Sequence, residues 1–197
     1  MRLIAFIEYA AVIAGILAMI AGHFLGIPKG FQFGVFLAGA GIALGGLEAV
    51  VTQRMCFRAS DDAYHEYAGV SALIVGLMCL LIGSAVIGSA YLLAEGLWPR
   101  TESYLIRRPA PLLGAAGALI LGMGVLMMLN PTGRSGWAWR LLVYVPRFLL
   151  GLVLLVAGLA AMAAGVWEWL QPPAYQDFVQ HLPRHLERIA AYLRSFL

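Results

Sequence analysis

Long, uninterrupted apolar runs alternate with short polar connectors along the 197-residue chain. Five of these runs are long enough for an α-helix to cross a hydrocarbon core of about 30 Å, which takes roughly 20 residues. A helix satisfies its backbone hydrogen bonds internally, as a lipid environment demands. The pattern therefore predicts an all-α integral membrane protein, a bundle of about five transmembrane helices. The runs cover residues 3–25, 31–51, 68–98, 112–129 and 141–169.

Tryptophans support these boundaries, because an amphipathic indole prefers the membrane interface. All five lie at the ends of runs, at Trp98, Trp137, Trp139, Trp167 and Trp169. Run 68–98 exceeds the required length by about ten residues, so its helix is expected to tilt or to project from the bilayer.

Two helix starts carry local signals. Run 141–169 contains Pro146, and proline is favoured in the first turn of a helix, so this helix begins either at Leu141 or at Pro146. Ser60, followed by Asp61 and Asp62, is typical of a helix N-terminus, where a hydroxyl caps free N–H groups and carboxylates favour the positive end of the dipole. This string predicts the cap of the helix in the third run.

Small residues recur at four-residue spacing inside the runs, which predicts close packing of helix backbones. Packing within one bundle is the simpler interpretation, and an intermolecular contact is the alternative. The sets are Gly22 and Gly26, Gly41 and Gly45, Ser84 and Gly88, Gly114 with Ala118 and Gly122, and Ala157 with Ala161 and Gly165.

Residues 174–197 form a polar tail with a periodic apolar stripe. Leu182, Leu186, Ile189, Leu193 and Phe196 follow one another at spacings of four, three, four and three. This spacing predicts an amphipathic helix that is too polar to span a membrane. Its apolar face either lies on the membrane surface or docks against a partner protein.

Composition excludes two broad classes. With 62% hydrophobic and 12% charged residues, the chain is far less charged than a soluble domain, which typically carries about a quarter. Its 13 basic residues form no dense block, so nucleic acid is not expected as a partner. Arginine greatly outnumbers lysine, which suggests GC-rich codons and hence a bacterial plasma membrane. The distribution of arginines between the two sides leaves the orientation open.

Few polar groups enter the runs, and those that carry charge lie near run ends. Glu8, Glu48 and Arg147 fall at a similar depth on the N-terminal side, so an intramembrane ion pair between Arg147 and either glutamate is one hypothesis. The alternative is that each side chain extends alone to the interface.

No catalytic, cofactor-binding or metal-binding residues are predicted. His23 ends the first run and His65 precedes the third, so the two fall on opposite sides of the membrane and cannot share a haem iron. His181 and His185 are four residues apart, but Pro183 disturbs the intervening turn and no carboxylate completes a metal-binding set. We therefore expect no cofactor.

Apolar spans and a small extramembrane mass favour a non-catalytic membrane subunit that stabilises, anchors or assembles a larger complex. Its expected partners are the lipid bilayer and other integral membrane subunits. One alternative is a small transporter or channel that acts as an oligomer, with Ser84 and Ser89 on its path. The other is an interfacial lipid-processing enzyme, which would need several of Glu8, Glu48, His23 and His65 to meet in one leaflet.

Overall fold

Seven helices and one two-stranded sheet make up the part of the chain that the computed structural model describes. That part covers residues 2–27, 29–58, 64–129 and 144–194, with side chains placed over 7–27, 29–55, 67–129 and 144–183. Five of the helices are long and apolar enough to cross a membrane, which confirms the predicted helical class at this level. These are α1 (Arg2–Phe24), α2 (Gly30–Thr52), α3 (Val70–Ala94), α5 (Ala110–Leu129) and α7 (Val145–Leu170).

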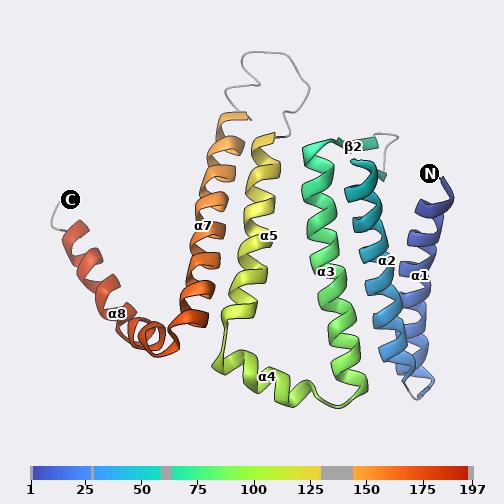
Figure 1. Ribbon diagram of the computed structural model, residues 1–197, viewed down its shortest axis with the longest axis horizontal. Helices are drawn as coiled ribbons and strands as arrows, with labels where there is room; N and C mark the ends of the chain where they lie inside the picture. The colour runs from blue at the N-terminus through green and yellow to red at the C-terminus, as the bar shows by residue number, and fades with distance from the viewer. Residues whose placement is uncertain (1, 28, 59–63, 130–143, 195–197) are drawn as a thin grey trace.

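The five long helices stand side by side in chain order, each antiparallel to the one before (Figure 1). Over the described ranges, each contacts only the long helices that precede and follow it: α1 meets α2, α2 meets α3, α3 meets α5, and α5 meets α7. Helix α1 does not touch α3, and α3 does not touch α7. A closed bundle would bring non-consecutive helices together, so the chain forms an open row in place of the compact bundle expected from its sequence.

Glycines seven residues apart bring the helix backbones together. A Cβ atom on any of them would lie within about 3.1 Å of an atom of the neighbouring helix, so only glycine permits the observed approach. The pairs are Gly15 and Gly22 in α1; Gly34 and Gly41, facing α1, and Gly39 and Gly46, facing α3, in α2; Gly76 and Gly83 in α3; Gly117 and Gly124 in α5; and Gly151 and Gly158, continued by Gly165, in α7.

The four-residue spacing predicted from the sequence is not the main period of these contacts. Gly88 and Gly114, both members of the predicted sets, face open space. Seven residues complete two turns with a drift of only about 20°, so glycines at that spacing stay on one face of nearly aligned helices. Four-residue rows follow ridges that suit larger crossing angles.

The contact between α3 and α5 is looser than the others. It includes Gly122 of α5, where a Cβ atom would lie 2.8 Å from Sδ of Met78 and 3.5 Å from Cγ2 of Ile74. Flexible side chains, in place of backbone, therefore fill this interface. The row divides here into two tightly packed parts, α1–α2–α3 and α5–α7.

A β-hairpin occupies the connector between α2 and α3. Strands β1 (Arg54–Arg58) and β2 (Tyr64–Ala68) pair antiparallel, and the N–H of Gly69 donates to the carbonyl oxygen of Gln53 where the hairpin closes. Gln53 (φ 52°) is in the left-handed helical conformation and Gly69 has a positive φ of 62°, and both turn the chain between helix and strand. The hairpin pairs backbone groups that a coiled connector would leave to water.

The predicted helix cap at Ser60 is wrong, because the helix starts later. Ser60, Asp61 and Asp62 lie outside the described residues, and α3 begins only at Val70, after β2. Its N-cap residue is Gly69, which has no side chain to donate or accept a hydrogen bond. The aromatic residues between 64 and 68 favour a strand over the predicted helical approach.

Run 68–98 does not form one overlong helix. Helix α3 ends at Ala94, and Gly96 (φ 66°) turns the chain after it. The next element is α4 (Trp98–Arg107), a ten-residue helix that runs crosswise from the end of α3 to the start of α5 (Figure 1). Pro99 stands in its first turn, where the missing N–H costs nothing. The polar residues of this segment predict a connector between helices, so α4 was not expected from the sequence.

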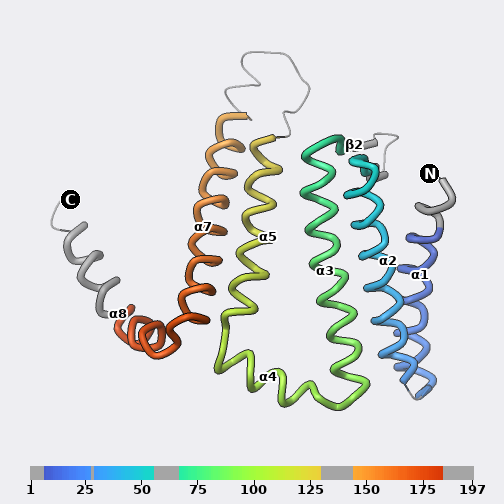
Figure 2. The backbone as a smooth tube through the Cα atoms, in the orientation of Figure 1, coloured from blue at the N-terminus to red at the C-terminus, as the bar shows by residue number. Residues whose placement is uncertain are grey.

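Helix α8 (Pro172–Arg194) is the predicted C-terminal helix, and α7 is described from a point next to the predicted start at Pro146, whereas Leu141, the other predicted start, lies outside the described residues. Val145 begins α7 and Pro146 lies in its first turn. The tube in Figure 2 leaves α7 after Leu170 and enters α8 directly beside it. Aromatic contacts stabilise this corner: the ring of Trp167 packs edge-on against Tyr175, with 5.9 Å between centroids, and at a tilt against Phe178, with 5.2 Å between centroids.

Candidate functional site

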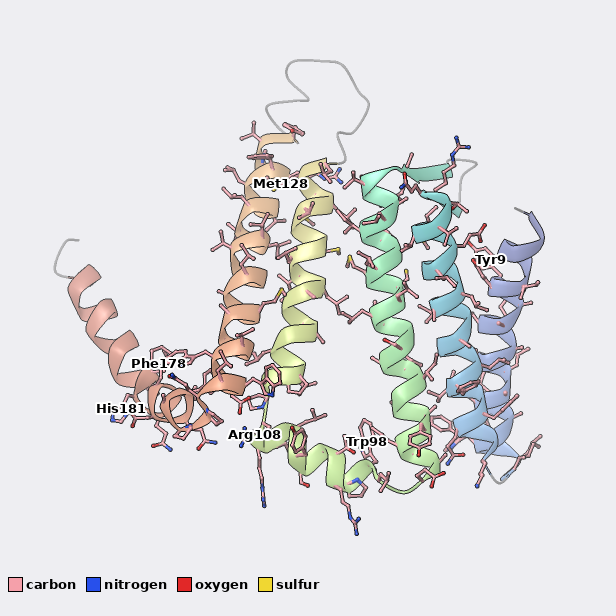
Figure 3. All side chains as sticks on the ribbon, viewed as in Figure 1. Tyr9, Trp98, Arg108, Met128, Phe178 and His181 are labelled. Carbon is pink, nitrogen blue, oxygen red and sulfur yellow. The ribbon has the colours of Figure 1, made fainter. Side chains whose placement is uncertain are left out.

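The structure brings together two of the three residues proposed for an ion pair. Glu8 of α1 and Glu48 of α2 lie close enough for their carboxyl groups to interact electrostatically. Tyr9, labelled in Figure 3, is next to Glu8 in the chain and shows that the two glutamates lie near the N-terminal end of α1. Arg147 does not join them, because α7 packs on α5 and α8 and contacts neither α1 nor α2.

Glycine makes room for the two carboxyl groups. A Cβ atom on Gly45 would lie 3.1 Å from Oε2 of Glu8, so the side chain of Glu8 rests against the bare backbone of α2. Oε1 of Glu8 is buried and has no hydrogen-bond partner over the described ranges. This unpartnered oxygen can accept a hydrogen bond from a donor or bind a cation.

Histidine does not complete this carboxyl pair. His23 lies fifteen residues after Glu8 on α1, about 22 Å along the helix, and its ring packs on Phe24. The side chain of His65 lies outside the described part. A lipid-processing enzyme would need several of these four residues to lie close together. Among the side chains that the structure describes, only Glu8 and Glu48 do so.

The serines proposed for a transport path bond to their own helix. The hydroxyl of Ser84 donates to the carbonyl oxygen of Leu81 at 2.9 Å, and that of Ser89 donates to Val86 at 2.7 Å. Both groups therefore have an internal partner and present little free polarity.

Of the five apolar tail residues, only Leu182 has a described side chain, and it is half-buried. Leu186, Ile189 and Leu193 lie within α8, but their side chains fall outside the described part, as does Phe196. Near the start of the helix, Nδ1 of His181 lies 3.4 Å from a carboxylate oxygen of Asp177, one turn earlier. Their exposure makes this a weak surface contact.

A cleft that was not predicted from the sequence lies at the opposite ends of the helices from Glu8, on the side of the molecule where α4 lies. Its volume is about 540 Å³, and it opens between the α4–α5 junction and the corner of α7 and α8. Figure 3 shows Arg108 and Phe178 on either side of this corner. The cleft is lined by Ile106, Arg107, Arg108, Pro109, Glu168, Tyr175, Gln176, Val179 and Gln180.

Glu168 is the most unusual residue of this cleft. It is only 1% exposed, and it is the one polar residue that is fully buried among those described. Oε1 and Oε2 both lack a hydrogen-bond partner in the part of the chain that the structure covers. Buried carboxylates are normally paired, since an unpaired one costs several kcal/mol of desolvation free energy, on the order of the whole stability of some domains.

Glu168 is one of the charged residues that lie near run ends, and neither it nor Arg107 or Arg108 was predicted to form a site. One feature of the sequence could have indicated the site. Glu168 stands between Trp167 and Trp169, and the adjacent pair Arg107 and Arg108 falls on the same side of the predicted membrane spans. Spacing along the sequence could not show that the start of α8 lines the same cleft as Glu168.

An apolar groove opens between the same ends of α5 and α7. Its volume is about 340 Å³, and small residues of both helices create it. The lining residues are Ala110, Pro111, Gly114, Met162, Gly165, Val166 and Trp169.

Comparisons with known proteins identify no relative: no family model matches the sequence, and no curated protein or solved structure matches the chain.

Proposed function

We propose that this chain is a non-catalytic membrane subunit that stabilises, anchors or assembles a larger membrane protein complex, in a bacterial plasma membrane. The open row of helices carries the proposal. Because each long helix contacts only its neighbours in the chain, the row leaves broad surfaces that no other part of the described chain covers. Such surfaces suit helix packing with another membrane protein.

Large side chains point away from the contacts within the row. The buried apolar residues over the described part are small: Ala38, Ala49, Ala72, Val75 and Ala90. Helix α2, in the middle of its three-helix group, carries an outward stripe that runs along its whole length. The stripe consists of Phe33, Phe36, Leu44, Leu47 and Val51, which are 45 to 74% exposed.

Phe36 and Ala38 offer a matched pair for testing whether this stripe contacts a partner. Phe36 is 47% exposed, whereas Ala38 is 8% exposed and faces Gly15 of α1. A photo-crosslinking amino acid at position 36 in cells should give one reproducible product with another membrane protein. The same amino acid at position 38 should give only crosslinks within the chain.

Mild extraction and native mass spectrometry should then show the crosslinked protein in fixed stoichiometry with this chain. A wild-type chain that leaves the membrane alone, with equal crosslinking at positions 36 and 38, would contradict the subunit proposal.

The amphipathic tail is proposed as a second attachment surface. Changing Leu186, Ile189 and Leu193 to Ser should leave membrane insertion intact, since the apolar helices satisfy their own backbone hydrogen bonds. The same variant should release the chain from its complex. Retention of the triple variant in the complex would remove the tail from the proposal.

A small transporter or channel is the second candidate, and Glu8 with Glu48 favours it. An ionisable pair inside apolar helices is a typical binding or relay group for protons and cations. Purified chain in sealed vesicles should then move protons or monovalent cations, and Glu8→Gln should abolish the flux. Absence of flux from the wild-type chain would leave the subunit as the better proposal.

A further inference from the structure

The cleft beside Glu168 combines an unpaired acid with two basic residues. Arg107 ends α4 and Arg108 follows it, and both are exposed. Glu168 stands one turn or less from the end of α7, and it lines the same cleft while remaining buried. No ion pair joins it to either arginine, because both of its oxygens lack a partner within the described part.

The other lining residues do not satisfy the carboxyl group of Glu168 either. Tyr175, Gln176 and Gln180 carry hydroxyl and amide donors at the cleft, yet none donates to Glu168. The rings of Trp167, Tyr175 and Phe178 hold α8 in this position, so the acid is enclosed by a packed corner. A buried acceptor in such a place calls for a donor from outside the chain.

The position of the cleft narrows the choice of ligand. It lies where α5 begins and α7 ends, at the boundary of two helices that are long and apolar enough to cross a membrane. Exposed apolar side chains also stand at its walls: Ile106 is 75% exposed and Val179 is 44% exposed. These surroundings fit a ligand that has a zwitterionic head group, with one positive and one negative charge, and an apolar tail.

We infer that the cleft binds the head group of an aminophospholipid of the phosphoethanolamine type. The phosphate binds Arg107 and Arg108, whose guanidinium groups donate in a planar fork that matches phosphate oxygens. The primary ammonium donates to the carboxylate of Glu168. A simple anion would leave Glu168 unpaired, and a simple amine would leave the arginines unused. The inference requires only that α5 and α7 cross the membrane, and it holds whether or not the chain is a subunit.

Wild-type chain provides the first test. Delipidated full-length protein in detergent is mixed with lipids of identical acyl chains that carry phosphoethanolamine, phosphocholine or phosphoglycerol head groups, and bound lipid is counted by native mass spectrometry. The phosphoethanolamine lipid should bind at least tenfold more tightly than the phosphocholine lipid, because a quaternary ammonium has no N–H to donate. Equal binding of these two lipids would overturn the inference without any variant.

Glu168→Gln provides the second test. It should reduce the preference for phosphoethanolamine over phosphocholine to within about twofold, since the amide no longer offers a charged acceptor. The matched control is Glu102→Gln, which makes the same change at an exposed residue of α4 outside the cleft and should keep the full preference. A folded Glu168→Gln variant with the wild-type preference would contradict the inference.

The arginines and the source of the head group are tested separately. Arg107→Gln combined with Arg108→Gln should weaken the phosphoethanolamine and phosphoglycerol lipids alike, because both lose their phosphate contacts. Soluble glycerophosphoethanolamine should not displace the lipid at equal concentration. If it does, the cleft takes a soluble ligand and the lipid assignment is wrong.

Discussion

Gly124 of α5 and Gly151 of α7 contact each other reciprocally. A Cβ atom on Gly124 would lie 2.7 Å from the carbonyl oxygen of Gly151, and one on Gly151 would lie 2.8 Å from the carbonyl oxygen of Gly124. Neither backbone can yield without moving a whole helix. Gly117 and Gly158 repeat the arrangement seven residues along, so α5 and α7 approach closely over two successive glycine pairs.

Gly124→Ala should lower the stability of the α5–α7 pair by about 1–3 kcal/mol, because a methyl group at this point forces backbone apart. Gly114→Ala on the same helix is the control, since a Cβ atom there meets open space. It should be neutral or stabilising by up to about 1 kcal/mol, as alanine favours helix over glycine. Thermal unfolding in detergent compares the two. Equal melting temperatures would show that the close approach is absent.

Glu8→Gln and Glu48→Gln should each melt at or above the wild-type temperature. The amide is uncharged and can donate to the remaining carboxyl group, so two acidic groups no longer face each other. Arg147→Gln should change the unfolding free energy by no more than about 0.5 kcal/mol. The double variant Glu48→Gln and Arg147→Gln should then be additive within about 0.5 kcal/mol. A larger coupling between positions 48 and 147 would restore the ion pair that the sequence suggested.

Chemical labelling of single cysteines should show on which side of the membrane each connector between the antiparallel helices lies. In a background without Cys56 and Cys79, Lys29→Cys and Glu102→Cys should react with a membrane-impermeant maleimide from the same side. Gln53→Cys should react only from the other side. All three positions are exposed, and Ala72→Cys, at a fully buried position, is the unreactive control. Labelling of positions 53 and 102 from one side would show that α3 does not cross.

Trp167→Ala should loosen the start of α8. The indole carries both ring contacts across the corner, and an aromatic pair contributes about 0.5–1.5 kcal/mol beyond the area it buries. Hydrogen exchange of residues 172–183 should accelerate by roughly tenfold, the factor that corresponds to about 1.4 kcal/mol. Trp169→Ala is the matched control, because Trp169 is 74% exposed and no ring contact involves it over the described range. Similar acceleration in both variants would contradict the role of Trp167.

Local pattern was sufficient where each element depends on its own residues. The long apolar runs predicted five helices whose ends agree with the structure within a few residues, except for run 68–98. That run failed because hydropathy does not show a turn: Gly96 and Pro99 divide it into α3 and α4 without interrupting the apolar character enough to be seen. The hairpin between 54 and 68 was missed for a related reason, since its strands are short and half polar.

The number, length and apolar character of the long helices follow from the sequence alone, because backbone hydrogen bonding and hydrophobic length act within a single segment. The tertiary structure alone decided which helices touch. Glu8 meets Glu48 because glycines let α1 lie close to α2, and Arg147 stays apart because α7 pairs with α5. Glu168 is a buried, unpartnered acid beside two arginines because α4, α7 and the first turns of α8 meet at one cleft. Arg108 and Glu168 are 60 positions apart in the chain, so their proximity depends on how whole helices pack. The spacing of residues along one helix does not show which helix packs beside it.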